Sequence, residues 1–380
     1  MGNDFRIKKE INYENLEYNF LKIKSFLPEK VKIMCVVKAD AYGLGAIKIS
    51  KIYEKFGAGA LAVANIDEAL SLRKNGVGLP ILILGYTPPC RVVDLHDFKI
   101  TQTLFSSSYA KKISDCAEKK GVKVDVHLKI DTGMSRLGFF FQNKTRDIKT
   151  LEEIKSLSLM KNINITGIFT HFSSSDDDQH FCEDTTNNQI NNFNYVVDFS
   201  KKIFKSLDLV HCSNSGAILF YPKANNNYVR AGIILYGYYP SKLAKNKVSL
   251  REVLKISTAV VQIKEVSEGT KISYGGTFVT KRRSKIATVP IGYADGLFRN
   301  LSNRGKMLVN GQFAPIVGNI CMDQCMLDVT DIRGDVREGD VVTVVGEDGK
   351  NIISIDDIAE LCGTINYEVL CNFKTLRSDG

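Results

Sequence analysis

Eight short apolar runs recur between residues 31 and 230, and each is followed by a turn and a segment with helical character. The runs are residues 31–37, 61–64, 81–84, 101–105, 124–130, 165–170, 207–211 and 228–230. Short buried strands that alternate with helices are typical of a parallel sheet covered by helices. Eight such units predict a closed (β/α)8 barrel. An open, doubly wound sheet is the structural alternative, and the absence of a G-x-G-x-x-G motif after the first run disfavours it.

The pattern changes after about residue 240, where strand-like segments separated by turns replace the alternation. These segments are residues 257–265, 285–289, 307–317, 325–329 and 341–346. The third of them contains Asn310-Gly311, which is typical of a tight hairpin. Ser354 and Asp357 have the spacing of a capping box, which predicts one helix in this part of the chain.

Length and composition allow two globular domains. The chain has 380 residues, of which 44% are hydrophobic and 24% are charged, and these proportions are ordinary for a protein with a large core. We therefore predict the fold class α/β plus β, with a TIM-type (β/α)8 barrel over residues 1–240 and a mostly β domain over residues 241–380. The N-terminus, MGNDFRIKKE, is charged, and no apolar run in the sequence is long enough to cross a bilayer. These features predict a cytoplasmic protein without a membrane partner.

The charged residues and cysteines limit the classes of ligand. The net charge of +9 comes from lysines and arginines that are spread along the chain. No basic patch is interleaved with aromatic residues, which disfavours a nucleic-acid partner and favours a site for an anionic ligand. The closest pair of the nine cysteines, Cys321 and Cys325, has no neighbouring histidine, and the acidic run at residues 176–178 beside His180 reads as a solvated loop. We therefore predict no metal site.

Polar residues follow the predicted strands, at the end where a barrel of this kind carries its active site. They are Lys38, Tyr86, Lys129, Asp131, Arg136, His171, residues 213–215 and Arg230. Their positive charges predict an anionic ligand. The turns at residues 213–217 and 230–233 follow the seventh and eighth strands, where such barrels often bind phosphate through backbone N–H groups.

Lys38 ends the first predicted strand, in the stretch VKIMCVVKADAYGLG. A lysine amine beside a phosphate site can form a Schiff base with a phosphorylated sugar, as in an aldolase, or with pyridoxal phosphate. Pyridoxal phosphate also needs partners for its pyridine nitrogen and its phenolic oxygen. The residues by themselves leave both chemistries open.

A series of motifs resembles one known family. The stretch VVKADAYGLG (residues 36–45) resembles the pyridoxal-phosphate attachment motif of alanine racemases, the fold-type III enzymes. The other matching motifs, in the family's order, are HLKIDTGMSRLG (127–138), GIFTHFSSSD (167–176), HCSNSGA (211–217), VRAGIILYG (229–237), ISYGGTF (272–278), VPIGYADGLFR (289–299), GNICMDQCMLDV (318–329) and TINYEVLC (364–371). The resemblance implies an isomerase that uses pyridoxal phosphate to interconvert L-alanine and D-alanine, and that supplies D-alanine for the peptidoglycan of the cell wall.

The resemblance also implies roles at the matching positions. Lys38 would hold the cofactor as an internal aldimine and act as the base on the D-alanine side, and Tyr274 would be the opposing base for L-alanine. Arg230 would donate to the pyridine nitrogen and Arg136 to the phenolic oxygen, with His171 beside the ring. The residues that would contact the phosphate are Tyr42, Ser215, Gly232, Ile233 and Tyr367.

The substrate side would be built largely by the second domain. Met322 and Arg136 would receive the substrate carboxylate, and Tyr293 and Asp323 would line the entrance. In this family the second domain completes the active site of the partner subunit, so the resemblance implies a head-to-tail homodimer. The lysine that matches Lys129 is often carbamylated in the family and then orients a neighbouring arginine, which is a hypothesis for this chain.

Alternatives to this interpretation differ in substrate or in chemistry. A racemase that acts on serine or on another small amino acid is the nearest alternative, and the bulky aromatic ring of Tyr367 at the methyl pocket favours alanine. A binding protein without turnover and a Schiff-base aldolase are both disfavoured, because the two bases and the pyridine-binding arginine are all present. After Cys371, residues 372–377 differ from the run that the family normally has, so we expect the last strand to be altered.

Overall fold

The computed structural model describes residues 5–176 and 180–373. Contacts within the chain divide it into two compact units, and each is described by itself. One unit comprises Leu16–Ala41 and Gly45–Arg251. The other comprises the chain up to Asn15, the short segment Tyr42–Leu44, and the chain from Glu252 onward. The domain boundary between residues 240 and 241 stays a prediction.

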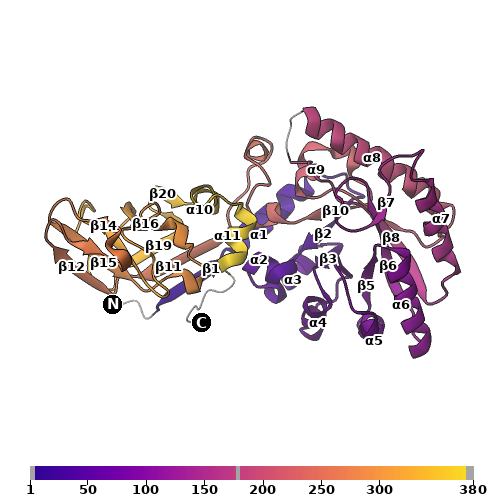
Figure 1. The fold of residues 1–380 in the computed structure, drawn as a ribbon, viewed down its shortest axis with the longest axis horizontal. Helices are drawn as coiled ribbons and strands as arrows, with labels where there is room; N and C mark the ends of the chain where they lie inside the picture. Colours follow the sequence, from indigo (N-terminus) through magenta and orange to yellow (C-terminus); the bar gives the residue numbers. More distant parts are fainter. Residues whose placement is uncertain (1–4, 177–179, 374–380) are drawn as a thin grey trace. The chain divides into compact units, whose positions relative to one another are not determined.

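The first unit is a closed barrel of eight parallel strands (Figure 1). The strands are β2 (Lys32–Val36), β3 (Ala60–Val63), β4 (Ile81–Ile83), β5 (Ile100–Leu104), β6 (Val124–Asp131), β8 (Ile163–Phe169), β9 (Leu209–His211) and β10 (Tyr228–Ala231). Pairing runs from β5 through β4, β3, β2, β10, β9 and β8 to β6, and the β5–β6 pairing closes the ring. Each strand overlaps one predicted apolar run, so the (β/α)8 barrel is confirmed. A short strand that was not predicted, β7 (Phe139–Phe140), adds to β6.

Helices follow the barrel strands, and their caps explain where two of them begin. The α-helices up to residue 220 are α1 (Tyr13–Lys24), α2 (Lys38–Gly43), α3 (Ala46–Lys55), α4 (Ile66–Lys74), α5 (Val92–Asp97), α6 (Ser107–Lys120), α7 (Ile148–Ser156), α8 (His180–Lys201) and α9 (Ser215–Phe220). The side chain of Asn65 accepts a hydrogen bond from Glu68 N at the start of α4. That of Ser106 accepts one from Tyr109 N at the start of α6. Both satisfy an N–H group that would otherwise lack a partner within the helix.

Short 3-10 helices connect many of these elements. In the barrel unit they are η1 (Pro89–Arg91), η2 (Leu157–Leu159), η3 (Pro222–Ala224), η4 (Ile233–Tyr236) and η5 (Lys242–Asn246). In the second unit they are η6 (Tyr274–Gly276), η7 (Tyr293–Asp295) and η8 (Arg299–Leu301). Two of them, η6 and η7, begin at tyrosines to which the sequence assigned a role.

The second unit is mostly β, as predicted. Its largest sheet has the order β1 (Ile7–Ile11), β11 (Leu254–Ala259), β19 (Val341–Asp348), β16 (Lys306–Val309), β17 (Gln312–Pro315), with β20 (Asn351–Ile353) also paired to β19. A second sheet contains β12 (Gln262–Val266), β15 (Ser284–Val289) and β18 (Cys325–Asp328), and a third pairs β13 (Lys271–Ile272) with β14 (Phe278–Val279). Two helices, α10 (Ile355–Cys362) and α11 (Asn366–Asn372), complete the unit.

Local turn and cap predictions in this unit are confirmed. Asn310 and Gly311 form the β16–β17 turn with φ angles of 50° and 69°, the left-handed conformation that a tight hairpin requires. Ser354 Oγ accepts from Asp357 N at 3.0 Å, and Asp357 Oδ2 accepts from Ser354 N at 3.1 Å, so the capping box begins α10.

One expectation for this unit was wrong, and the altered last strand stays a prediction. Residues 257–265 do not form one strand, because the chain leaves the first sheet after Ala259 and enters the second at Gln262. Residues 366–372 form the helix α11. The rest of the divergent run, residues 374–377, lies outside the described residues.

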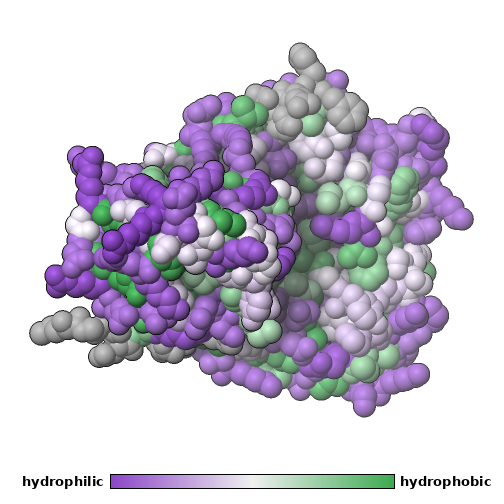
Figure 2. Space-filling model, turned by 60° about the vertical axis from the view of Figure 1, so that its left-hand side comes forward, coloured by the Kyte–Doolittle hydropathy of each residue, from purple (hydrophilic) through white to green (hydrophobic). Residues whose placement is uncertain are grey.

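Hydrophilic residues are frequent on the surface that Figure 2 shows. In the face shown in Figure 2, hydrophilic residues cover most of the surface and hydrophobic residues occur in small groups. Among the described residues, no helix combines the length and the apolarity that a membrane crossing requires. Within the same ranges, no three or more His, Cys, Asp and Glu side chains are placed to hold a metal ion.

Candidate active site

The barrel brings several of the predicted site residues to one rim. Lys38 comes two residues after β2, and His171 comes two residues after β8. Arg230 lies near the end of β10, the last strand of the barrel. Lys129 lies near the end of β6. Because all eight strands are parallel, their carboxyl ends lie at the same end of the barrel.

Lys38 opens a left-handed helical turn, α2. The four residues from Ala39 to Tyr42 have φ angles of 53°, 57°, 53° and 57°, and Gly43 continues at 84°. For residues with a side chain, this conformation costs about 1–2 kcal/mol each. Specific contacts hold the turn in place: Ala39 N donates to Glu68 Oε1 at 2.8 Å, and Asp40 Oδ1 accepts from Ala46 N at 2.8 Å. Strain that is maintained in this way is concentrated at functional sites.

Arg230 is the centre of a buried hydrogen-bond network. Its side chain is only 3% exposed. Nη1 donates to Nδ1 and O of His211 at 2.8 and 3.0 Å. Nη2 donates to Thr170 O at 2.7 Å, to Cys212 O at 3.0 Å and to His171 Nδ1 at 3.2 Å. Among the described residues, Nε of Arg230 has no hydrogen-bond partner, so one N–H group of the guanidinium remains available to a ligand.

The guanidinium fixes the protonation of three histidines. An arginine side chain only donates, so Nδ1 of His211 and Nδ1 of His171 must both accept. The proton of His211 therefore lies on Nε2, which is 3.0 Å from His127 Nδ1 and donates to it. Burial, and next the charge of Arg230, lower the pKa of His127 to about 3 and the pKa values of His171 and His211 well below their usual range. The three rings are neutral at physiological pH.

Arg230 itself stays charged. Burial lowers the pKa of its guanidinium to about 10, which is still well above neutrality. Within the described residues, its hydrogen-bond partners are carbonyl oxygens and neutral imidazoles, with no carboxylate among them. The aromatic ring of Phe169 lies beside it, with the Arg230 Cζ 5.3 Å from the ring centroid. Arg230 is thus a buried cation whose Nε–H group is available as a hydrogen-bond donor.

Lys129 is a second buried cation-forming group, and it is only 6% exposed. Its Nζ lies 5.1 Å from the centroid of Phe169. Burial, and next the charge of Arg230, lower the pKa of Lys129 to about 7, with Arg136 adding to the effect and Asp131 opposing it. A large fraction of this lysine is therefore an uncharged, nucleophilic amine at neutral pH.

A carboxylate shapes the loop that carries Arg136. Asp131 Oδ1 accepts hydrogen bonds at 3.0 Å from the backbone N–H groups of Gly133, Met134 and Ser135. Ser135 has a φ angle of 54°, so the loop makes a left-handed step just before Arg136. The exposed Arg136 side chain therefore extends from a loop whose backbone is fixed.

The turns after β9 and β10 meet at Ser215 and Gly232. Ser215 Oγ accepts a hydrogen bond from Gly232 N at 3.1 Å, which joins the first residue of α9 to the residue before η4. Asn214 Oδ1 caps α9 by accepting from Ala217 N at 2.9 Å. Ile233, the first residue of η4, is fully buried. The structure thus brings together the predicted phosphate-contacting residues of the two turns.

Two more residues predicted at the phosphate lie in the second unit. Tyr42 and Tyr367 have ring centroids 6.0 Å apart, with their planes inclined by 51°. Tyr42 is 6% exposed, and burial raises the pKa of its phenol far above the usual range, so it is a hydrogen-bond donor and not a phenolate. Tyr367 lies in the first turn of α11.

Three of the remaining predicted residues lie on one concave surface of the second unit, whereas Tyr293 is the first residue of η7 and is 42% exposed. Tyr274, Met322 and Asp323 line a hollow of about 940 Å³, together with Lys264, Lys271 and neighbouring residues of β12, β13, β15 and β18. Tyr274 is 73% exposed and Met322 is 54% exposed. Asn319 Nδ2 donates to Tyr274 O at 2.7 Å and holds the backbone of the turn.

Three residues that contact Arg230 or its histidine network were not singled out from the sequence. His211 and His127 form the network behind Arg230, and Phe169 packs against it. His127 precedes Lys129 by two residues on β6, a spacing that places both side chains on the same face of the strand. This two-residue spacing was the signal that could have identified His127. Nothing in the sequence pairs His127 with His211, because 84 residues separate them.

Comparisons with known proteins point to one family. Residues 11–240 match the profile of the alanine racemase N-terminal domain, and residues 253–378 match that of the C-terminal domain. An alanine racemase of Clostridium novyi is 45% identical over 363 residues, which cover 95% of this chain and 92% of that protein.

Solved structures show the same relationship. The alanine racemase of Clostridium difficile 630 superposes with a TM-score of 0.89 at 42% identity, covering 96% of this chain and 93% of the other. The alanine racemase of Bartonella henselae, with covalently bound pyridoxal phosphate, has a TM-score of 0.84 at 30% identity and 97% coverage of both chains. The chain therefore belongs to the alanine racemase family.

Proposed function

We propose that this chain racemises alanine with pyridoxal 5'-phosphate, and that it supplies D-alanine for peptidoglycan synthesis. The observation that carries the proposal is Arg230, whose Nη1 and Nη2 groups are occupied by protein acceptors while Nε has no partner among the described residues. A buried donor of this kind suits a neutral ring nitrogen. Membership of the alanine racemase family supports alanine as the substrate.

The side chains of the barrel rim fit this cofactor. Arg230 Nε would donate to the pyridine nitrogen, and Arg136 would donate to the phenolic oxygen. Lys38 would bind the cofactor covalently through Nζ. The phosphate would be held by Tyr42, Ser215, Gly232, Ile233 and Tyr367, where hydroxyl and backbone N–H donors suit an anion. The relative from Bartonella henselae, which carries covalently bound pyridoxal phosphate, supports this assignment.

The bound cofactor would supply an electron sink that acidifies the Cα–H bond of the amino acid. Lys38 Nζ would exchange a proton with Cα on the D-alanine side, and Tyr274 Oη would do so on the L-alanine side. Bases on opposite faces invert the centre without any rotation of the substrate. His171 would lie beside the ring, where its Nδ1 is held by Arg230 at 3.2 Å.

Arg230 would limit side reactions because it keeps its proton. With a pKa of about 10 the guanidinium donates a hydrogen bond without transferring the proton, and the neutral His211 and His127 behind it offer no carboxylate to change this. An unprotonated pyridine nitrogen withdraws electrons less strongly. The residues therefore favour simple proton exchange at Cα over transamination.

The substrate side would be completed across a head-to-tail homodimer. Tyr274, Tyr293, Met322 and Asp323 would act on the site of the partner subunit, with Met322 and Arg136 at the substrate carboxylate and Tyr293 and Asp323 at the entrance. The exposure of Tyr274 and Met322 on a hollow surface supports this role, because large apolar side chains gathered there suit a protein interface.

Lys129 would be carbamylated. A pKa of about 7 supports this step, because only the neutral amine reacts with carbon dioxide. The N–C bond forms as the amine loses a proton, and the product is an anion that would orient Arg136. Carbon-13 NMR in labelled bicarbonate tests it: a carbamate resonance that Lys129→Met abolishes is expected, and a free amine would exclude it.

Substrate choice is tested by a coupled assay on both enantiomers of alanine and of serine. We expect alanine to be preferred, because the aromatic ring of Tyr367 leaves little room beyond a methyl group. A preference for serine would establish the alternative, a racemase of broader small amino acids on the same scaffold. Borohydride reduction followed by peptide mapping tests the cofactor, and we expect the label on Lys38.

A further inference from the structure

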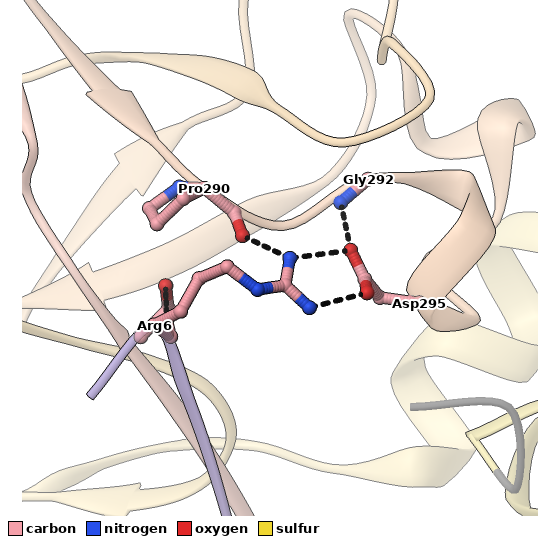
Figure 3. Close-up of polar contacts among 5 residues, drawn as sticks. Arg6, Pro290, Gly292 and Asp295 are labelled. Carbon is pink, nitrogen blue, oxygen red and sulfur yellow. Dashed lines mark hydrogen bonds and ion pairs between the residues drawn. The ribbon is translucent and has the colours of Figure 1, made fainter. Parts of the chain in front are cut away.

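A bidentate ion pair joins the N-terminal segment to the loop that carries Tyr293 (Figure 3). Arg6 Nη2 donates to Asp295 Oδ1 at 2.8 Å, and Nη1 donates to Asp295 Oδ2 at 3.2 Å. The Asp295 side chain is fully buried, whereas 30% of the Arg6 side chain is exposed. A buried carboxylate is expensive to desolvate unless a cation and further donors satisfy it.

The same two side chains hold both ends of the short loop. Arg6 Nη1 also donates to Pro290 O at 2.9 Å, where β15 has just ended. Asp295 Oδ2 accepts from Gly292 N at 3.1 Å, and Asp295 N donates to Gly292 O at 3.0 Å. Tyr293 lies between these anchors, so its backbone is fixed by contacts that do not involve its own side chain.

The loop is in turn bonded to the segment that carries Met322. Tyr293 N donates to Cys321 O at 3.1 Å, and Ala294 N donates to Met322 O at 3.0 Å. The approach is so close that a Cβ atom on Gly292 would lie 2.3 Å from Met322 O. Any displacement of the loop must therefore displace Met322 as well.

Arg6 is itself held by the large sheet. Thr258 Oγ1 donates to Arg6 O at 2.7 Å, and Ile7 pairs with Thr258 where β1 meets β11. The ion pair thus connects a rigid sheet edge to two segments with proposed roles at the substrate.

We propose that Arg6 and Asp295 are positioning residues, which hold Tyr293 and Met322 at the distance that the substrate requires. The inference rests on the proposed function in one respect, namely that these two residues face the substrate. Tyr274 lies on a different turn, which Asn319 holds and which is linked to the loop through the segment that contains Asn319 and Cys321, so the ion pair acts on the proton transfer only indirectly. Binding of alanine is therefore expected to suffer more than turnover.

The test compares Arg6→Gln with Arg6→Lys and with a matched control, Arg282→Gln. Arg282 forms an exposed ion pair with Asp331 in the same unit, and it contacts no proposed site residue. We expect Arg6→Gln to raise KM for alanine about tenfold with kcat changed less than threefold, because misplacement of binding groups acts first on substrate binding. Arg6→Lys should recover part of the loss, and Arg282→Gln should match the wild type.

Hydrogen exchange gives a readout that needs no activity. In Arg6→Gln the backbone amides of Gly292, Tyr293 and Ala294 should exchange faster, whereas peptides of α10 should be unchanged. Unchanged KM together with faster exchange would overturn the positioning role, and unchanged exchange would overturn the structural link itself. If the wild-type protein does not racemise alanine, the proposed function fails, and the exchange result still decides whether the ion pair holds the loop.

Should Arg6→Gln fail to fold, Asp295→Asn replaces it. The amide oxygen can still accept from Gly292 N, but the charge that attracts Arg6 is gone. We expect a smaller rise in KM, about threefold, with the same amides exchanging faster. If instead kcat fell about threefold and KM stayed unchanged, the pair would act on the chemical step, and the proposal would be overturned.

Discussion

The barrel rim and the hollow surface of the second unit prepare their residues in opposite ways. At the rim, Arg230 and Lys129 are 3% and 6% exposed, and their pKa values are lowered mainly by burial. On the hollow surface, Tyr274 is 73% exposed and its turn is held through backbone contacts. The barrel therefore tunes charge, whereas the second unit controls position.

This difference predicts which measurements each region will affect. Substitutions in the barrel should change protonation, cofactor attachment and stability, because they alter buried charge. Substitutions on the hollow surface should change rates or substrate binding and leave stability nearly intact, because exposed side chains contribute little to the core. Each prediction below tests one side of this comparison.

The largest effect is expected for Lys38→Ala. The variant should lose covalent cofactor attachment and one of the two bases, and racemisation should fall by on the order of 10³-fold or more. The measurements are the racemisation rate and the mass of the borohydride-reduced protein. Lys51→Ala, an exposed lysine of α3, is the control and should retain both. A Lys38→Ala protein that kept the reduced adduct would remove the barrel lysine from the chemistry.

Tyr274→Phe tests the second unit. We expect racemisation from L-alanine to fall by on the order of 10²-fold, because general-base catalysis on one face is lost. Exchange of the D-alanine Cα hydrogen with deuterated solvent should fall much less, since Lys38 serves that face. The thermal midpoint should stay within about 1 °C of the wild type, because this side chain is exposed. Equal losses of Cα-hydrogen exchange from L-alanine and from D-alanine would contradict the two-base assignment.

Gly167→Ala tests the packing behind Arg230. An added Cβ atom would lie 2.5 Å from the ring of His127, in a region with no space to relax. The free energy of unfolding should fall by about 1–3 kcal/mol, which denaturant titration measures. Gly78→Ala is the matched control, because its new methyl group would meet only the flexible end of Glu54. Equal losses in both variants would indicate that the histidine network does not depend on tight packing.

The barrel was predictable from the sequence because its strands are buried on both faces. Such strands read as continuous apolar runs, and each of the eight runs overlaps a strand. In contrast, β1 was missed because Lys8, Lys9 and Glu10 interrupt its apolar residues, as is common at the edge of a sheet. The bend between β11 and β12 was missed because Val260 and Val261 are apolar and give no turn signal.

The site residues were predictable where a local sequence motif marks them. Lys38 and Arg230 follow from strand ends and from the family resemblance. The left-handed turn after Lys38 did not follow, because Ala39 and Ala41 are residues that rarely adopt it and the cause lies in distant contacts such as that with Glu68. The ion pair between Arg6 and Asp295 spans 289 residues, and pairing over that separation is a property of the fold.

The smallest effect, taken per pH unit, concerns the pH dependence that Lys129 gives to the barrel. In the folded protein its pKa is lowered to about 7, whereas in the unfolded chain it returns to the ordinary value of about 10.4. Between these two values the unfolded chain binds the proton and the folded protein does not. The free energy of unfolding therefore rises with pH across this window, and the penalty is complete below pH 7.

Lys129→Met should remove that slope, which is about 1 kcal/mol per pH unit, in guanidinium chloride titrations between pH 7 and pH 10. Lys264→Met, on the exposed surface of the second unit, should keep the slope of the wild type. In bicarbonate the wild-type slope should persist, because a carbamylated nitrogen, like the neutral amine, lacks the proton that the unfolded lysine binds. A wild-type slope that persists in Lys129→Met would show that buried charge at the barrel rim is carried by another group, and the contrast between the two units would then need a different origin.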